Sequence, residues 1–476
     1  MVQLELIDHR MHQQLVQTRL PFKFGVQVLR RVPIAQLDVM VVTPDGRRGV
    51  GRASDLLVPK WFEKNPVTTP DADSAALAAS VEAAIGVAEI ATRTAGPHPV
   101  FDIAEIARLE LIGGRDHGDP DVLVRGFGVA MLERALIDAA CRLAGVSFDE
   151  ALRRNLLGFS ASRLIPEIKG WMPSDLPAPA NMISVRHTVG MLDPLTTGEI
   201  PPDERVDDGL PQALEEDISV YGVSRFKVKI GGDHAANEDR LRAVAAVVSK
   251  AAGPDAVFTL DGNEQCADLE GLAGMLEDLR HDPATSPMIN RLGLIEQPLP
   301  RRDSFDESQR PGLVRLGRIA PVIIDEADTD RDAFRRAIDL GYQGVSVKAC
   351  KGVFRAIANR GLLEHRRAQG ASGLFQSGED LTNLGSIPLQ QDLCLQAQLG
   401  VADVERNGHH YFRGLDHLPR ETAHDLTREL PHLYEQDDQG DVRLLIRNGR
   451  LRLDGVVNGV GFGGPLGSMA SEAPEG

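Results

Sequence analysis

The sequence predicts a (β/α)8 barrel with an α+β capping domain in front of it. From about residue 165, eight short apolar segments alternate with amphipathic ones, which is the pattern of βα units around a parallel sheet. Intervals of 23 to 35 residues separate Asp261, Glu296, Asp325 and Lys348 from one to the next. Each interval fits a strand, a helix and two loops, which favours a closed barrel over an open doubly wound sheet. No GxGxxG fingerprint opens a predicted helix, which weakens the dinucleotide-binding alternative.

The capping domain is expected to occupy residues 1–160. Alternating apolar residues over 35–54 predict a β-hairpin that turns at Pro44, Asp45 and Gly46. Further along, apolar residues recur at helical spacing and stop at Gly145, a typical helix C-cap. The residues of this apolar stripe are Leu132, Leu136, Ala139, Ala140 and Leu143.

The barrel is expected over residues 161–420. The predicted strands lie at 183–190, 225–232, 256–263, 293–300, 321–328, 344–351, 373–380 and 402–409. Residues 192–212, between the first two strands, are rich in proline and acidic residues and would lie at the face where barrel enzymes keep their active sites, so we expect a substrate lid there. Residues 421–476 are expected to pack back on the capping domain and to end in a frayed tail, 461–476.

Composition and charge narrow the class of partner. The chain has 476 residues, a formal charge of −17 and a pI near 5.3, so its field would repel nucleic acid and anionic membranes. The four cysteines are widely spaced and suggest reduced thiols. No secretory signal or continuous apolar span is apparent. We therefore expect a cytoplasmic protein that takes a small substrate, without nucleic-acid or membrane partners. We also expect it to form a homo-oligomer.

Charged residues end the second to the sixth predicted strands, although charges are costly inside a barrel. They are Lys227 and Lys229, Asp261, Glu296, Asp325, and Lys348. Taken singly, each carboxylate is better explained as a strand-end cap or a salt bridge than as a metal ligand. On three consecutive strands, however, they converge toward the barrel axis and offer the hard oxygen ligands that suit Mg²⁺.

The three lysines would approach a bound substrate from two sides. Lys227 and Lys229 come from the second strand and Lys348 comes from the sixth. An ammonium group near a second cation and a divalent metal loses proton affinity, which brings its pKa toward that of a general base at neutral pH. We therefore expect one lysine to act as the base and its neighbour to give electrostatic support.

The order of these motifs resembles the enolase superfamily, and within it the muconate lactonizing enzyme-like subgroup of the mandelate racemase/muconate lactonizing enzyme family. The motifs are KVK at 227–229, LDGN at 260–263, IEQPLP at 295–300, IIDEA at 323–327 and SVKACKG at 346–352. The resemblance covers most of the chain and implies the same barrel with the same kind of capping domain.

The resemblance also implies roles for individual residues. Asp261, Glu296 and Asp325 would bind Mg²⁺. Lys229 would remove or return the proton α to a substrate carboxylate, Lys227 would stabilise negative charge, and Lys348 would be the acid/base on the opposite face. The seventh strand lacks the histidine of the mandelate racemase-like branch, VERNGHH replaces the acidic DxD common in dipeptide epimerases, and KGVFR replaces the usual glycine pair after the sixth-strand lysine.

Other polar and aromatic residues are candidates for substrate contacts. Glu379, with Asp380, would orient a lysine or bind a hydroxyl group, or else begin a helix. His409 and His410 follow the last strand and are either substrate contacts or loop histidines, and Asn263 and His187 are either cavity groups or satisfied core residues. The capping segments 20–25 and 58–66 match the two site-closing loops of the superfamily, so Phe24, with Phe22, and Trp61 would form an apolar wall or simply pack.

These observations favour a Mg²⁺-dependent lyase or isomerase that abstracts the α-proton of a carboxylate to give a metal-stabilised enolate. Dehydration, racemisation or epimerisation, and cycloisomerisation all begin in this way. An alternative is a barrel lyase that forms a Schiff base through Lys348 or Lys229. A third possibility is a barrel that binds a ligand without turning it over.

Overall fold

The computed structural model describes residues 1–115, 119 and 121–469. Eight parallel strands form a closed barrel, because β12 pairs with β5 as well as with β11. The strands are β5 (Met182–Val189), β6 (Arg225–Lys229), β7 (Val257–Asp261), β8 (Leu292–Glu296), β9 (Val322–Ile324), β10 (Gly344–Val347), β11 (Phe375–Gly378) and β12 (Asp403–Arg406). Each predicted segment overlaps one of these strands, and β5 and β8 begin one residue earlier than predicted, so the predicted barrel is confirmed.

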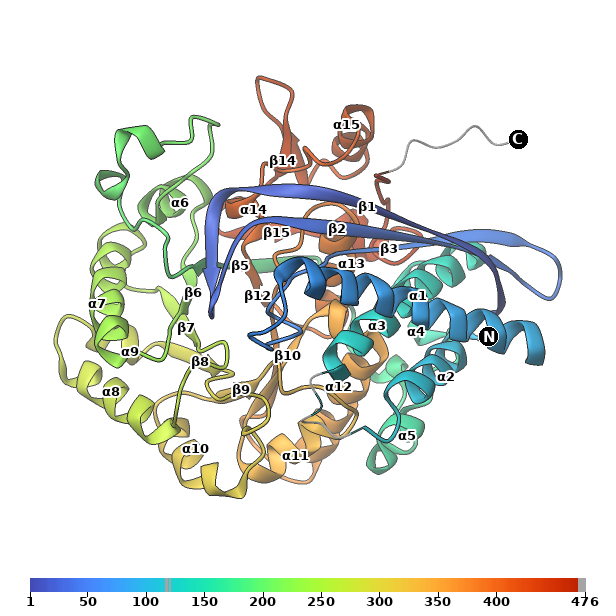
Figure 1. Ribbon diagram of the computed structural model, residues 1–476, viewed down its shortest axis with the longest axis horizontal. Coiled ribbons are helices and arrows are strands. Elements are labelled where there is room, and N and C mark those ends of the chain that lie inside the picture. The colour runs from blue at the N-terminus through green and yellow to red at the C-terminus, as the bar shows by residue number, and fades with distance from the viewer. Residues whose placement is uncertain (116–118, 120, 470–476) are drawn as a thin grey trace.

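Helices follow the barrel strands and surround them (Figure 1). They are α6 (Leu214–Tyr221), α7 (His234–Ala251), α8 (Leu269–His281), α9 (Ser286–Ile289), α10 (Arg310–Gly317), α11 (Ala333–Leu340), α12 (Val353–Ala368), α13 (Ile387–Gln398) and the short α14 (Gly408–Tyr411). The apolar face of each long helix covers the outer surface of the strands, as Leu241, Val244 and Val248 of α7 show by their complete burial.

The capping domain combines an antiparallel sheet with three long helices. The sheet has the order β3-β2-β1-β4, with β1 (Gln3–Phe24), β2 (Gln27–Val42), β3 (Arg48–Leu56) and β4 (His98–Pro99). The helices are α1 (Pro70–Ala95), α2 (Val100–Ile112) and α3 (Asp121–Ala144). In Figure 1 the long β1–β2 ribbon extends across the barrel toward α6.

The predicted hairpin and helix end are both present in the capping domain. Residues 43–47 turn between β2 and β3, with Gly46 at a φ of 85°. Helix α3 stops at Gly145, whose φ of 66° suits glycine. A side chain at Gly51 of β3 would lie 2.0 Å from the carbonyl oxygen of Ala135, so glycine here allows α3 to pack directly on the sheet.

Helix α1 is long and apolar enough to cross a membrane by length and composition alone, although no continuous apolar span was expected from the sequence. In the fold, Leu77, Val81 and Ile85 of this helix are buried against the rest of the capping domain. Helices α2 and α3 pack beside it. Core helices of globular domains meet the same length and composition criteria, so this helix is weak evidence for a membrane.

The C-terminal region joins the barrel to the capping domain. It contains α15 (Arg420–Glu429), β13 (Tyr434–Gln436), β14 (Val442–Leu444), β15 (Arg450–Arg452) and α16 (Asp454–Asn458). Strand β15 pairs antiparallel with β5, the first barrel strand. The backbone N–H of Met469 donates to Gln36 of β2, and that of Phe462 donates to Asp138 of α3.

Part of the predicted frayed tail is therefore ordered. Phe462 is fully buried, and Gln390 donates to the carbonyl oxygen of Gly463. The small residues of this segment allow close packing of the backbone rather than fraying: a side chain on Gly464 would lie 2.2 Å from the carbonyl oxygen of Gly455. The remainder of the predicted tail, 470–476, lies outside the described residues.

Candidate active site

The charged strand ends meet inside the barrel. Lys227 and Lys229 alternate with buried Val228, so both point to the same face of β6. Lys229 Nζ lies 2.5 Å from Asp261 Oδ2 at the end of β7. Lys348 follows β10, and its Nζ lies 2.7 Å from Asp325 Oδ2. Strands β6 and β10 are four places apart in an eight-stranded barrel, so Lys229 and Lys348 approach the axis from opposite sides.

Lys227 lies at the centre of the buried charges. Its side chain is completely buried, and its Nζ is 2.6 Å from Glu296 and 3.1 Å from Asp261. On the other side, the same ammonium group is 2.7 Å from Glu379 of the β11 end and 2.8 Å from Glu405 of β12. One cation thus connects the carboxylates of β7 and β8 with those of β11 and β12.

A second lysine supports Asp325. Lys351, in the turn after β10, lies 3.1 Å from Asp325 Oδ1 and donates to Ser346 Oγ at 2.7 Å. The Lys348 ammonium lies 4.5 Å from the ring centroid of Trp61, a cation–π contact from the capping domain. Asp325 is therefore held by two lysines, and one of them is covered by an aromatic ring.

The residues present fit a divalent cation with oxygen ligands. Asp261, Glu296 and Asp325 end three neighbouring strands and are all buried. Glu296 Oε2 is paired with the Lys227 ammonium at 2.6 Å, but Glu296 Oε1 has no hydrogen bond among the described residues, which is costly for a buried anion. Three convergent carboxylates without sulfur or imidazole are a donor set for Mg²⁺ rather than for Zn²⁺.

The pKa values of the buried groups reflect the excess of carboxylates around each lysine. Burial alone would lower the pKa of Lys348, but the neighbouring Asp325 carboxylate raises it above the ordinary lysine value. Burial also acts to lower the pKa of Lys227, but its four neighbouring carboxylates raise that pKa well above the ordinary lysine value. These directions are opposite to the lowering expected from neighbouring cations, because each ammonium group contacts carboxylates more closely than it contacts other lysines.

Glu296 shows the complementary effect. Burial raises its pKa well above the ordinary value, and the nearby Asp261 and Glu379 carboxylates add to this shift. Asp325, in contrast, has a lowered pKa, since Lys348 and Lys351 outweigh the effect of its burial. Of the three carboxylates at these strand ends, Glu296 alone has a raised pKa, since the pKa values of Asp261 and Asp325 are lowered.

The predicted substrate residues occupy different places. Glu379 is buried beside Lys227 and also pairs with Arg186, and no helix begins at SGED because α13 starts only at Ile387. Asp380 pairs with Arg406. Asn263 follows Asp261 at a φ of 42°, and its Nδ2 lies 3.4 Å from Glu326 Oε1.

The two capping segments do approach this end of the barrel. Trp61 is buried above Lys348, and Phe24 is buried at the end of β1 next to Phe22. Phe22 in turn stacks on Tyr411, with ring centroids 4.2 Å apart. The aromatic residues of both segments therefore lie at the interface between the capping domain and the barrel.

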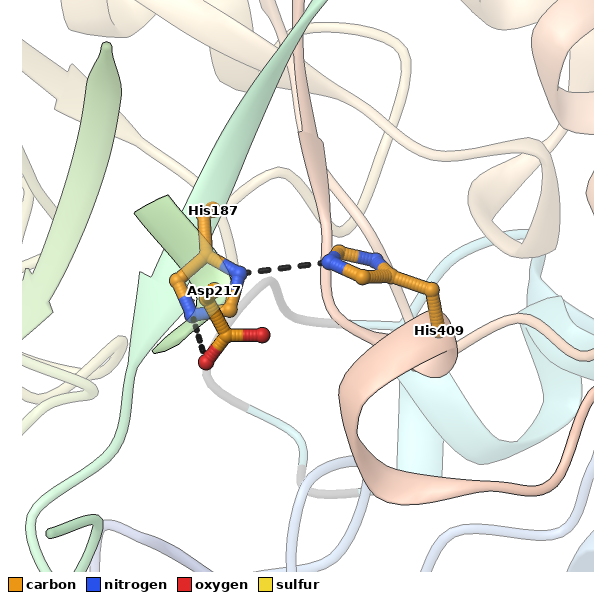
Figure 2. A group of neighbouring side chains, drawn as sticks. All are labelled: His187, Asp217 and His409. Atoms are coloured by element: carbon orange, nitrogen blue, oxygen red, sulfur yellow. Dashed lines mark hydrogen bonds and ion pairs between the residues drawn. The ribbon is translucent and has the colours of Figure 1, made fainter. Parts of the chain in front are cut away.

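His409 and His410 are brought together with His187, but not with the lysines. Arg186 and Thr188 contact Glu379 and Glu405 inside the barrel, so His187 between them points to the outer face. Figure 2 shows His187 between His409 and Asp217 of helix α6. This histidine cluster is thus separated from the lysine–carboxylate cluster by the barrel wall.

The predicted lid residues contact the capping domain. Arg19 of β1 forms a bidentate ion pair with Asp208, with N···O distances of 2.6 and 2.9 Å. It also donates hydrogen bonds to the carbonyl oxygens of Pro211 and His410. The side chains of Arg19 and Asp208 are 3% and 5% exposed. The loop that follows β5 is therefore joined to the β1–β2 hairpin in this structure.

A further ionic group lies at the second capping segment. Lys64 is 3.1 Å from Glu264 and 3.6 Å from Glu326, the neighbour of Asp325. Arg301 pairs with Glu264 and donates to the carbonyl oxygens of Trp61 and Phe62. Burial raises the pKa of Glu326 to about 7.

Sequence interpretation missed several charged residues of the interior. They are Glu405, Lys351, Arg186, Glu326 and Lys64. Glu405 lies in the last predicted strand, in the same way as the other carboxylates lie in theirs. The criterion that identified those carboxylates could therefore have identified Glu405 from the sequence. Lys351 and Lys64 lie in turns, where a lysine gives no periodic signal, so only the three-dimensional contacts identify them.

No family model matches the chain, and no curated protein matches it in sequence. Solved structures with the same fold do match along almost the whole length. A mandelate racemase/muconate lactonizing protein from Herpetosiphon aurantiacus is 18% identical, with 96% of this chain and 98% of that chain covered and a TM-score of 0.56.

Two liganded structures match in the same way. An enolase from Bradyrhizobium, complexed with magnesium and mandelic acid, is 16% identical, with 98% of this chain and 97% of that chain covered and a TM-score of 0.56. A substrate-liganded L-Ala-D/L-Glu epimerase from Bacillus subtilis is 14% identical, with 97% and 99% covered and a TM-score of 0.57. The chain therefore has the capped barrel fold of these enzymes.

Proposed function

We propose that this protein is an enolase-superfamily lyase or isomerase that removes the proton α to the carboxylate of a small substrate and forms an enolate. One observation carries the proposal. Lys229 and Lys348 lie on opposite sides of the barrel, and the carboxylates of Asp261, Glu296 and Asp325 lie on the three strands between them. This arrangement allows proton transfer at either face of a carbon atom held near the barrel axis.

Asp261, Glu296 and Asp325 would hold the metal ion. Bound there, Mg²⁺ would supply positive charge to the substrate carboxylate and would lower the proton affinity of the neighbouring lysines. The fit rests on the unpartnered Oε1 of Glu296 and on the all-oxygen donor set.

The lysines divide the proton transfers between two faces. Lys229, in neutral form, takes the α-proton from one face and becomes an ammonium ion. Lys348 gives a proton to the opposite face for racemisation, or to a leaving group for elimination. Lys227 stays charged, because four carboxylates surround it, and it supplies fixed positive charge near the developing enolate.

The capping domain would exclude water and contact the distal part of the substrate. Trp61 covers Lys348, and Arg19 joins the β1–β2 hairpin to the loop that carries Asp208. The residues of the capping domain would select the part of the substrate that lies away from its carboxylate. The proposed substrate class is therefore a small carboxylate. Self-association of the chain stays a prediction from the sequence.

The test is a screen of small carboxylates in D₂O with MgCl₂, in which mass spectrometry follows the exchange of the α-proton. We expect exchange with at least one compound, and its loss on addition of EDTA. Lys229→Met and Lys348→Met should each reduce exchange by at least about 100-fold, in keeping with the usual contribution of a general acid or base. Lys250→Met, at an exposed position on α7, is the matched control and should keep full activity.

The Schiff-base alternative predicts a different result. It requires a neutral lysine nucleophile, whereas the carboxylate neighbours raise the pKa of Lys348. Borohydride would trap a covalent adduct in that case, and EDTA would have no effect on turnover. Trapped adduct on Lys348 or Lys229, together with unchanged α-protons in every carboxylate, would replace our proposal with this alternative.

A further inference from the structure

A buried cluster of histidines lies on the outer face of the barrel, where the first and last strands meet. His187 is on β5, His409 and His410 are on α14 after β12, and Asp217 is on α6. Apart from His409, which is partly exposed, these side chains are almost completely buried. Since the strand wall separates this cluster from Lys227 and the carboxylates around it, the proton-transfer chemistry proposed above does not use it.

The geometry of the cluster is close to that of a metal complex. One ligand atom from each of His187, Asp217 and His409 lies within 4.8 Å of the other two. His187 Nδ1 and His409 Nε2 are 3.2 Å apart, whereas Asp217 Oδ2 is 3.5 Å from the other ring nitrogen of His187, Nε2, so an ion held between the two histidines requires the Asp217 carboxylate to move toward Nδ1. Two nitrogens that share a tetrahedral zinc ion, with bonds of 2.0–2.1 Å, are separated by about 3.3 Å. Figure 2 shows both neighbours directed at the imidazole ring of His187.

The hydrogen bonding of the cluster leaves donor atoms unused. His409 Nδ1 and His410 Nε2 are buried and have no hydrogen-bond partner among the described residues. His410 Nδ1 lies 3.2 Å from Asp217 Oδ1 and 3.1 Å from Oδ2, so it orients the carboxylate through both oxygens, and Oδ2 is also 3.5 Å from His187 Nε2. A histidine or carboxylate that orients a metal ligand in this way is a regular feature of protein metal sites.

We propose that His187, Asp217 and His409 form a second metal site, selective for a divalent transition metal ion such as Zn²⁺, with His410 as the residue that orients Asp217. Two imidazoles and one carboxylate are a ligand set for Zn²⁺, whereas Mg²⁺ prefers oxygen ligands. A pocket lined by Tyr221, Arg406 and His409 gives the ion a path to the cluster.

The position of the site indicates what the ion does. It joins α6, which follows the loop containing Asp208, to α14, which follows the last barrel strand. Arg19 donates both to Asp208 and to the carbonyl oxygen of His410, so the β1–β2 hairpin contacts both of the joined segments. A bound ion therefore stabilises the closing point of the barrel and the base of the predicted lid, without taking part in proton transfer.

The experiment measures zinc binding by the full-length protein without an affinity tag. The protein is stripped with EDTA, equilibrated with excess MgCl₂ to occupy the interior carboxylates, and dialysed against low ZnCl₂. We expect about one zinc ion per chain by elemental analysis, and a rise in the unfolding temperature with zinc. Cobalt in place of zinc should give the intense visible absorption of a four-coordinate nitrogen and oxygen site.

Variants of the cluster residues test whether this cluster is the zinc-binding site. His409→Ala and Asp217→Asn should each lose the bound zinc and the zinc-dependent rise in unfolding temperature. The exposed His432→Ala is the matched control and should keep both. If Asp217→Asn does not fold, the test of the metal site rests on His409→Ala, because His409 is partly exposed. Zinc retained by His409→Ala, or no stoichiometric zinc in the wild-type protein, would overturn the proposal, and neither result depends on finding the substrate of the enzyme.

Discussion

Glu379 Oε2 lies 2.7 Å from Lys227 Nζ, although the two residues belong to strands on different sides of the barrel interior. Both side chains are completely buried, and Glu379 also pairs with Arg186. The carboxylate therefore offsets two buried cations at once. This relationship makes the seventh strand part of the charge balance of the site, in addition to any contact with substrate.

Replacement of Glu379 by alanine should destabilise the protein strongly. The change leaves Arg186 and Lys227 without one buried partner each, and the loss of one member of a buried pair typically costs about 3–5 kcal/mol in the free energy of unfolding. Urea denaturation followed by circular dichroism measures this change. Glu150→Ala is the control, because its pair with Arg154 is exposed and such pairs contribute about 0–1 kcal/mol. Equal effects of the two changes would contradict the role of Glu379.

Glu296→Gln should separate metal binding from the stability of the metal-free protein. The pKa of Glu296 is raised by burial and by its carboxylate neighbours, so a neutral side chain relieves repulsion. We expect an unfolding temperature in EDTA no lower than that of the wild type. With Mg²⁺ at a hundred times its Kd, the wild type should gain about 2.7 kcal/mol, and the variant should lose most of this gain.

Differential scanning calorimetry with and without MgCl₂ measures both effects. Glu277→Gln is a suitable control, because Glu277 pairs with Arg315 on the outer surface of the barrel. A Glu296→Gln protein that keeps the full magnesium-dependent stabilisation would show that the ion binds elsewhere.

Stability should depend on pH through Glu133 of α3. Burial raises its pKa to about 7, and its Oε1 accepts a hydrogen bond from the N–H of Phe354 at the interface between the capping domain and the barrel. A carboxyl with a raised folded-state pKa holds its proton more tightly in the folded state. Its contribution is complete below its unfolded pKa, and it is lost as the pH rises from about 4.5 to about 7.

Glu133→Gln should remove this component, because the amide oxygen still accepts the Phe354 hydrogen bond and does not titrate. The free energy of unfolding of the wild type should fall, relative to that of the variant, by up to about 3 kcal/mol between pH 4.5 and 7. Urea titrations at several pH values measure the difference. Parallel curves for the two proteins would contradict the assignment.

The contact between Arg19 and Asp208 should control the mobility of the predicted lid. Arg19→Met removes the ion pair and the hydrogen bonds to Pro211 and His410, so residues 192–212 should become more accessible to protease. Limited proteolysis with mass spectrometry locates the cleavage sites. Arg30→Met, at an exposed position of β2, should leave the pattern unchanged. If cleavage of Arg19→Met occurs at the same rate as in the wild type, the contact does not hold the loop.

Much of the fold was predictable because it follows local periodicity. Alternating strands such as 225–232, helical stripes such as that of α3, and charged residues at strand ends are short-range patterns. They were enough to predict the closed barrel and to identify the positions of Asp261, Glu296 and Asp325 on consecutive strands. Whether these three carboxylates bind a metal stays a prediction.

The remaining features depend on contacts between distant segments. The pairing of Arg19 with Asp208 and that of Lys227 with Glu405 join parts of the chain with no common pattern. The outer position of His187 follows from the inward contacts of Arg186 and Thr188, which only the structure reveals. The antiparallel pairing of β15 with β5 has no local signal either.

The connection of residues 450–469 to the first barrel strand and to the capping domain has a consequence for synthesis of the protein. Gln36 of β2 and Ser468 are hydrogen-bonded partners separated by 432 positions along the chain. On the ribosome, the capping domain emerges first but gains these partners last, and contacts of such long sequence separation form slowly. The cover of the site is therefore completed only after the whole barrel has been translated, so a nascent chain passes through synthesis without a finished active site.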